Sequence, residues 1–257
     1  MNILQSLVLG VVEGFTEFLP ISSTAHLIIT SRFLGVIQSD YTKTFEIAIQ
    51  SGAILAVLVL YFRRFLDVEV LKRIIVAFIP TGVLGLLFYS FIKDNLFGSM
   101  SVVLWALGLG GFILILFEYL FKNDREGGDD LKTLNFKTLL GIGLFQSLAI
   151  VPGVSRSAAT IVGGMLLGLK RATIVEFSFL LAVPTMVVAT GFDLFKNFHE
   201  FSSSQALLLF LGFITSFITA LLGIRFLLAY VRRHTFTSFG IYRILLVILL
   251  IFLGFTR

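Results

Sequence analysis

Residues 13–27, EGFTEFLPISSTAHL, place ionisable and hydroxyl side chains inside an otherwise apolar stretch. Glu13 and Glu17 are four residues apart, so on a helix they share one face. In a low dielectric two neighbouring carboxylates repel each other, and a bound divalent cation relieves that repulsion. Oxygen ligands without cysteine suit Mg²⁺ or Ca²⁺. The pair therefore predicts a metal site, and the alternative is that both carboxylates face water at a helix end.

Three hydroxyl residues, Ser22, Ser23 and Thr24, follow the proline of this stretch, and His26 comes two residues after the last of them. Serine and threonine are good helix N-caps, so we expect at least one of the three to cap the next helix. His26 lies one helical turn after Ser23, within reach for a base that removes a hydroxyl proton. The spacing favours Ser23 as a nucleophile activated by His26, although a lone histidine is more often structural.

A second polar stretch, PGVSRSAAT, contains Arg156 together with Ser155, Ser157 and Thr160. An unpaired arginine at this depth in an apolar segment would be expensive, so Arg156 needs an anionic partner. An arginine, several hydroxyls and a helix N-terminus together form a phosphate-binding set. The alternative is a structural salt bridge to one of the two glutamates, and a resting state could combine both.

Together these residues suit one reaction class, phosphoryl transfer to water. The carboxylates would hold a metal, a hydroxyl would attack, a histidine would accept its proton, and Arg156 with the metal would neutralise developing charge. A polyprenyl pyrophosphate, whose tail stays in lipid, fits such a site. Spacing alone leaves open whether Ser23, His26 or a water molecule attacks phosphorus.

The composition identifies the setting of this chemistry. The chain has 257 residues, of which 57% are hydrophobic and only 14% charged, against roughly 25% charged in an average soluble domain. Several apolar runs reach the roughly 17–25 residues that cross a bilayer, which predicts an all-α polytopic membrane protein. There is no cysteine, no cleavable signal is evident, and the net charge of +5 indicates basic cytoplasmic loops rather than nucleic-acid binding.

Six apolar segments are long enough to cross the membrane, and two further regions, 1–37 and 136–169, are interrupted by Pro20 and by Pro152-Gly153. A half of about 15 residues covers roughly 22 Å as a helix, less than the core of about 30 Å. We therefore expect two re-entrant helical hairpins. The six predicted crossings are residues 44–62, 73–92, 99–121, 173–191, 204–229 and 239–255.

The distribution of basic residues predicts the orientation. Twelve Lys and Arg residues border the loops on one side, and five lie on the other. By the positive-inside rule the richer side is cytoplasmic, so the first hairpin opens to the exterior and the second to the cytoplasm. The loops on the richer side are 63–72, 122–136, 169–172 and 230–238.

The two interrupted regions also resemble each other. Gly10 aligns with Gly143 and Glu13 with Gln146, and a hydroxyl-rich turn follows the proline in each. Each unit is one hairpin plus three crossings, so the second unit is inserted upside down, an arrangement that places sites near the midplane. We predict one integral membrane domain, 1–257, containing an inverted repeat of about 1–122 and 136–257 joined by the cytoplasmic loop 122–136.

These stretches carry a family resemblance. The chain resembles the bacterial undecaprenyl pyrophosphate phosphatases of the BacA (UppP) type, associated with bacitracin resistance, nearly from end to end. The resemblance rests on LGVVEGFTEFLPISSTAHL, KTFEIAIQSGAILAV, VPGVSRSAATIVGGMLLG, EFSFLLAVP and the closing IYR at 241–243. The glutamate motif and the PGxSRSxxT motif in one chain and in this order are highly specific.

The resemblance implies a metal-dependent hydrolase that recycles the lipid carrier of cell-wall precursors, from undecaprenyl pyrophosphate to undecaprenyl phosphate and inorganic phosphate. It implies a multi-pass protein of the bacterial inner membrane, with membrane lipids around it and a site open to the periplasmic or exterior side. Glu13 and Glu17 match the acidic motif. Ser23 and His26 match the nucleophile and its partner, and Arg156 matches the phosphate-binding motif.

Two other functions fit parts of the sequence. A polyprenyl-phosphate transporter or flippase would also use inverted repeats and broken helices, but it would leave its substrate chemically unchanged. An intramembrane serine protease built on Ser23 and His26 leaves the glutamates and Arg156 without a role. A homodimer is a candidate assembly, whereas no nucleic-acid partner is expected.

Overall fold

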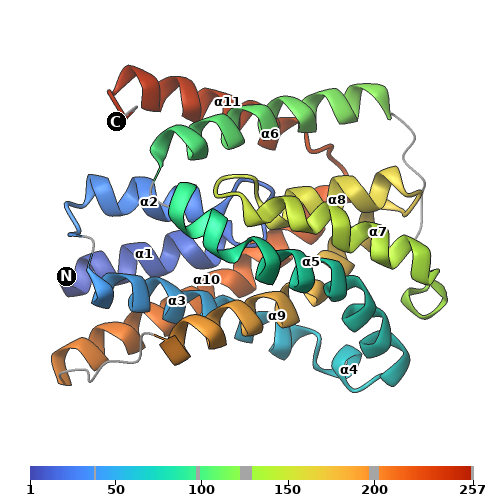
Figure 1. Cartoon of the computed structure of the whole chain (residues 1–257), viewed down its shortest axis with the longest axis horizontal. Helices are drawn as coiled ribbons and strands as arrows, with labels where there is room; N and C mark the ends of the chain where they lie inside the picture. The colour runs from blue at the N-terminus through green and yellow to red at the C-terminus, as the bar shows by residue number, and fades with distance from the viewer. Residues whose placement is uncertain (38, 97–98, 122–128, 197–202, 256–257) are drawn as a thin grey trace.

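The computed structural model of the chain describes residues 1–37, 39–96, 99–121, 129–196 and 203–255, and within these ranges it is helical with no strand. This confirms the all-α class (Figure 1). Residues 122–128 of the predicted cytoplasmic loop lie outside the described part. The helices are α1 (Ile3–Thr16), α2 (Ser23–Phe33), α3 (Asp40–Leu60), α4 (Phe62–Phe65), α5 (Val68–Asn95), α6 (Met100–Leu120), α7 (Phe136–Ser147), α8 (Arg156–Leu166), α9 (Arg171–Lys196), α10 (Ser203–Val231) and α11 (Thr237–Phe252), with short 3₁₀ turns η1 (Leu131–Thr133) and η2 (Leu148–Ile150).

Five helices in the described part are long and apolar enough to cross a membrane: α3, α5, α6, α9 and α10. They correspond to five of the six predicted crossings. The sixth falls on α11, which has 16 residues. At 1.5 Å per residue it is about 24 Å long, shorter than a hydrocarbon core of about 30 Å. The chain is therefore a multi-pass membrane protein, while the sixth crossing stays a prediction.

Both interrupted regions form pairs of short helices, α1 with α2 and α7 with α8, as the prolines predicted. The two turns end in the same way. Ser22 has φ 72° and caps α2 by accepting from the Ala25 amide, and Ser155 has φ 74° and caps α8 by accepting from the Ala158 amide. A positive φ is uncommon for a residue other than glycine, and such residues gather at functional sites.

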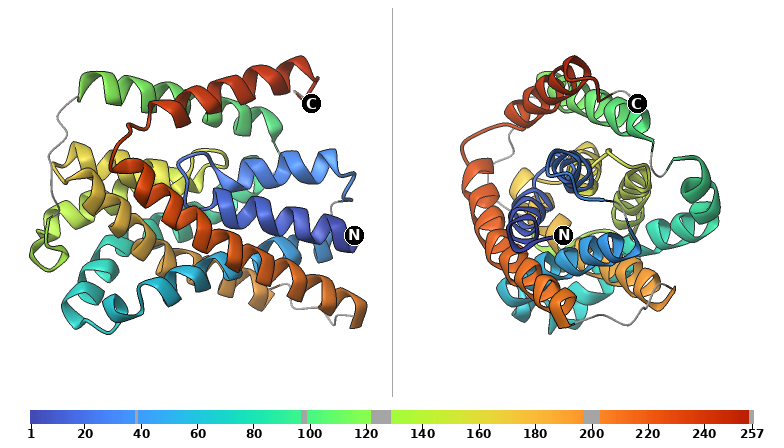
Figure 2. Two further views of the ribbon diagram at one scale, coloured as in Figure 1. Left: turned by 180° about the vertical axis from the view of Figure 1, so that it is seen from behind. Right: turned by 90° about the vertical axis from the view of Figure 1, so that its left-hand side faces the viewer.

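The longer helices surround these hairpins. In the end-on view α1, α2 and α8 lie inside a ring of longer helices (Figure 2, right). Helix α10 packs on α1 and α3, α5 packs on α7 and α9, and α6 pairs with α11. Two aligned glycines allow close approaches: a Cβ at Gly10 would meet the Gly212 carbonyl at 2.6 Å, and a Cβ at Gly143 would meet the Ala77 carbonyl at 2.1 Å.

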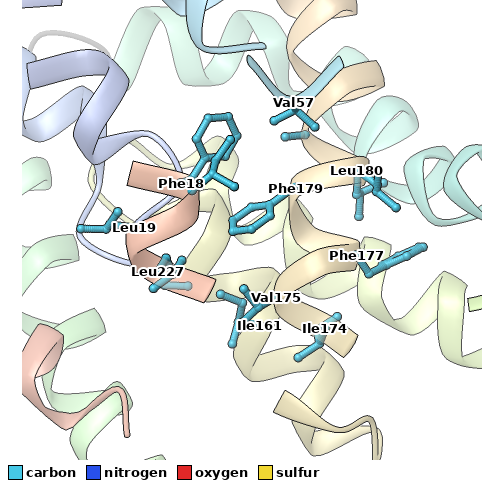
Figure 3. Close-up of a cluster of buried hydrophobic side chains, with 14 of the residues drawn as sticks. Phe18, Leu19, Val57, Ile161, Ile174, Val175, Phe177, Phe179, Leu180 and Leu227 are labelled. Atoms are coloured by element: carbon cyan, nitrogen blue, oxygen red, sulfur yellow. The ribbon is translucent and has the colours of Figure 1, made fainter. Parts of the chain in front are cut away.

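The hydrophobic core fixes the position of the first turn. Phe18, which lies in this turn, is fully buried and meets Phe179 of α9 edge to face, with 5.5 Å between ring centroids (Figure 3). Such T-shaped contacts are a preferred arrangement of aromatic rings, and they stabilise the fold beyond the burial of apolar area. Since Glu17 directly precedes Phe18, the packing of the Phe18 ring also fixes the backbone position of Glu17.

Candidate active site

Glu17 is the residue at which the two hairpins meet. Its Oε2 accepts a hydrogen bond from the hydroxyl of Ser23, and its Oε1 accepts one from Nη2 of Arg156 at 3.2 Å. The guanidinium is held on its other side, where Nη1 donates to the Ser178 carbonyl at 2.9 Å. All three site residues are largely buried. Helix α1, the start of α2 and the start of α8 thus bring together an acid, a hydroxyl and a cation.

Glu13 lies one turn before Glu17 on α1 and is fully buried. Neither of its carboxylate oxygens accepts a hydrogen bond from a protein donor, and its carboxylate lies beside that of Glu17. Two carboxylates make such a contact only with a proton or a cation between them. The Nε donor of Arg156 is likewise buried and without a partner. The cluster therefore contains unmet acceptors and an unmet donor in one place.

His26 does not make the contact that the sequence predicted. The hydroxyl of Ser23 is directed at Glu17, while His26 Nδ1 lies 2.7 Å from the Ser22 carbonyl and Nε2 lies 2.7 Å from Oη of Tyr242. The reason is local: at the start of α2 the carbonyl four residues back is the nearest acceptor for the imidazole. In this structure the Ser23 hydroxyl is therefore paired with Glu17 rather than with His26, and activation of Ser23 by His26 stays a prediction.

The predicted phosphate-binding hydroxyls divide into two groups. Ser22 and Ser155 cap their helices. Ser157 and Thr160 are fully buried, and they donate to the Leu19 and Arg156 carbonyls at 2.8 Å each. The Ser157 bond ties the start of α8 to the first turn, whereas the Thr160 bond lies within α8, so in this structure both hydroxyls have structural partners. The half-buried Thr24 follows Ser23 on α2, and direct substrate contact by any of these hydroxyls stays a prediction.

Arg243, to which the sequence alone assigned no role, is fully buried. Its described hydrogen bonds all go to backbone carbonyls: Pro20 at 3.4 Å, Gly153 at 3.1 Å, Val154 at 3.2 Å, Leu107 at 3.1 Å and Ala106 at 2.9 Å. This side chain therefore ties both hairpin turns to α6. An arginine inside an apolar segment was the available signal, because intramembrane charges are usually functional.

The cluster is closed in this structure. The exposed fractions of Glu13, Glu17 and Ser23 are 0%, 8% and 7%. Two open cavities lie elsewhere, one of about 520 Å³ at the start of α1 and one of about 670 Å³ between α3, α4 and η1, and neither is lined by a residue of the cluster. The cluster must therefore become accessible before an anionic headgroup reaches it.

These features define a class of protein: a multi-pass helical membrane protein in which a buried cluster of an acid, an arginine and a hydroxyl lies between two helical hairpins. Such a cluster can bind a phosphate group and activate a hydroxyl for attack on it.

Comparison with known proteins identifies the family. The model of the bacitracin resistance protein BacA family matches residues 6–249. A protein of Sulfurihydrogenibium sp. named undecaprenyl-diphosphatase is 52% identical over 97% of this chain and 98% of its own. Proteins of the same name from Aquifex aeolicus and Thermus thermophilus are 51% and 49% identical, each over 94% of both chains. The chain belongs to the BacA family.

Proposed function

We propose that this protein hydrolyses undecaprenyl diphosphate to undecaprenyl phosphate and inorganic phosphate. The relatives with nearly full-length similarity bear the name of this activity. The observation that carries the proposal is Glu17, which binds the Ser23 hydroxyl with one carboxylate oxygen and the Arg156 guanidinium with the other. A base, a nucleophile and an anion-binding group are thereby joined in one buried contact.

In the first step the Ser23 hydroxyl attacks the terminal phosphorus. The Ser23 Oγ–P bond forms, the bond from phosphorus to the bridging oxygen breaks, and undecaprenyl phosphate leaves with the bonding electrons. Glu17 accepts the hydroxyl proton, because its Oε2 already accepts that hydrogen bond. Arg156, released from Glu17 as the acid becomes neutral, is free to bind the phosphoryl oxygens. Fixed donors of this kind stabilise the charge that develops in the transition state.

In the second step water attacks the phosphoserine. The oxygen of water bonds to phosphorus, the Ser23 Oγ–P bond breaks, and Glu17 returns its proton to Oγ. Water loses a proton, and His26 is the base we assign to it, since residues three apart on a helix are neighbours. Phosphate leaves, His26 releases its proton to solvent, and the hydrogen bond between Ser23 and Glu17 forms again.

A divalent cation, Mg²⁺ or Ca²⁺, is proposed at Glu13 and Glu17. The two partnerless oxygens of Glu13 fit an electropositive ligand better than they fit a packed protein interior. Within the described ranges, no group of three or more His, Asp or Glu residues could hold an ion alone. Mg²⁺ is commonly bound by one or two carboxylates plus substrate phosphates. When bound, the cation would supply charge neutralisation at the diphosphate.

We also propose that the two hairpins are re-entrant and belong to the two halves of an inverted repeat. The site would face the exterior of the bacterial cell membrane. Equivalent helices pack in the same way, since α1 lies on α10 and α7 lies on α5. The chain has no cysteine, so single cysteines report topology directly. In intact cells an impermeant thiol reagent should label Ile37→Cys and should leave Lys132→Cys unlabelled. Labelling of only the second variant would reverse the orientation.

The activity is tested by phosphate release from undecaprenyl diphosphate, using purified protein with Mg²⁺ or Ca²⁺ and then with EDTA. We expect metal-dependent release that Ser23→Ala abolishes. Ser147→Ala is the matched control, because its hydroxyl donates to the Leu144 carbonyl at the end of α7. Binding of the lipid without phosphate release by folded wild-type protein would refute the phosphatase and favour lipid transport.

A further inference from the structure

Helix α11 contributes a side chain to the candidate site from the IYR stretch, to which the sequence alone assigned no role. Tyr242 of α11 places its hydroxyl 2.7 Å from Nε2 of His26, and the two rings are stacked, with 5.6 Å between centroids and 13° between planes. The contact joins residues 216 positions apart. His26 is thus held at both ring nitrogens, and its ring lies nearly parallel to that of Tyr242.

The partners of the two nitrogens determine the tautomer of neutral His26. A backbone carbonyl can only accept a hydrogen bond, so the Nδ1 atom facing the Ser22 carbonyl must be the protonated one. Nε2 then has a lone pair and accepts from the Tyr242 hydroxyl. If His26 takes up a proton, Nε2 becomes a donor, and the same hydroxyl can accept. One phenol therefore serves both protonation states without movement of either ring.

The position of Tyr242 is itself fixed by the turns of the site. Its neighbour Arg243 donates to the carbonyls of Pro20 and Gly153, one in each hairpin turn. Helix α11 cannot slide along α6 without breaking these bonds. Tyr242 is 42% exposed, so it lies at the open edge of an otherwise closed cluster.

We propose that Tyr242 is a positioning residue that fixes the ring and the tautomer of His26, so that Nε2 is the proton acceptor during hydrolysis of the phosphoserine. This inference rests on the proposed phosphatase function. Partners that orient a functional histidine typically contribute about 10–100-fold to activity. The loss is expected in kcat, because Tyr242 acts through His26 and the affinity for the diphosphate comes from other groups.

The test is Tyr242→Phe, which removes one oxygen and retains the stacked ring. We expect kcat for phosphate release to fall by about 10–100-fold with KM changed less than about twofold. Tyr230→Phe is the matched control, because Tyr230 also donates to α11, at Ser238, and stacks on His234, away from the site. In a His26→Ala background, Tyr242→Phe should have no further effect on kcat, which is the expected sign of action through His26.

A second readout does not depend on activity. The chain contains three histidines, so ¹⁵N-histidine labelling gives few signals, and His26→Ala identifies the one of interest. The wild type should show a single Nδ1–H tautomer, and Tyr242→Phe should show exchange between tautomers. Unchanged ¹⁵N shifts together with wild-type kcat in Tyr242→Phe would overturn the inference. If the wild type released no phosphate, the proposed function would fail, and the ¹⁵N shifts would still decide the role of Tyr242.

Discussion

The two hairpins have the same backbone arrangement, but their aligned buried polar residues differ in whether they have hydrogen-bond partners. At aligned positions the first hairpin has Glu13 and the second has Gln146, and both side chains are buried. Gln146 has partners on both ends: its Nε2 donates to Thr81 at 2.9 Å and to Thr185 at 3.1 Å, and its Oε1 accepts from Thr160 at 3.4 Å. Neither oxygen of Glu13 has a donor.

This difference separates a structural position from a functional one. Buried polar groups are nearly always hydrogen-bonded, because a partnerless group loses its hydration without compensation. The satisfied amide of Gln146 needs nothing further and holds α7 against α5 and α9. The unsatisfied carboxylate of Glu13 is destabilising unless something binds to it. The two halves thus share a backbone arrangement, but of this aligned pair only Glu13 is a buried polar group without a hydrogen-bond partner.

The largest expected effect on kcat comes from breaking the ion pair between Glu17 of the first hairpin and Arg156 of the second. Glu17→Ala and Arg156→Ala should each lower kcat by about 10²–10³-fold, since each removes one side of the bridge and leaves the other charge buried alone. Phosphate-release kinetics measure the loss. If Arg156→Ala kept kcat within about twofold of the wild type, Arg156 would take no part in the chemistry.

Exchanging the aligned residues tests the comparison itself. Glu13→Gln should raise the unfolding temperature measured in EDTA, because it removes a buried carboxylate that repels Glu17. The same variant should lose the additional stability that Mg²⁺ gives the wild type. Gln146→Glu should lower the stability by about 1–3 kcal/mol, since the donors and acceptors around it no longer match.

Thermal unfolding in detergent, with and without Mg²⁺, measures both variants. Stabilisation of Glu13→Gln by Mg²⁺ equal to that of the wild type would remove Glu13 from the metal site.

The smallest effect is expected at a surface pair outside both hairpins, which gives a baseline. Lys132 Nζ lies 2.6 Å from Oδ2 of Asp67, and this hydrogen bond lowers the pKa of Asp67 below its ordinary value. A lowered folded-state pKa stabilises the protein above the unfolded pKa, and the contribution disappears as the pH falls through the folded pKa. Surface pairs of this kind contribute little.

Asp67→Asn and the wild type should therefore unfold at nearly the same temperature at acidic pH and separate slightly toward neutral pH. Unfolding temperatures measured across this range provide the check. A separation that grew toward low pH would contradict the assigned sign.

The sequence by itself determined the class, the broken helices and the residues with reactive groups. These properties are local: apolar length decides what can cross a membrane, and proline and glycine decide where a helix ends. The sequence also placed Glu17, Ser23 and Arg156 in one predicted site, because a charged residue in an apolar chain needs a partner of opposite charge.

Only the tertiary structure decided which of these groups touch. Spacing along α2 suggested that Ser23 and His26 pair, but the fold brings Glu17 to the hydroxyl and Tyr242 to the imidazole. It also showed Arg243 holding both turns by their carbonyls. Backbone carbonyls leave no signature in a sequence, and contacts across two hundred residues depend on how helices pack rather than on their order.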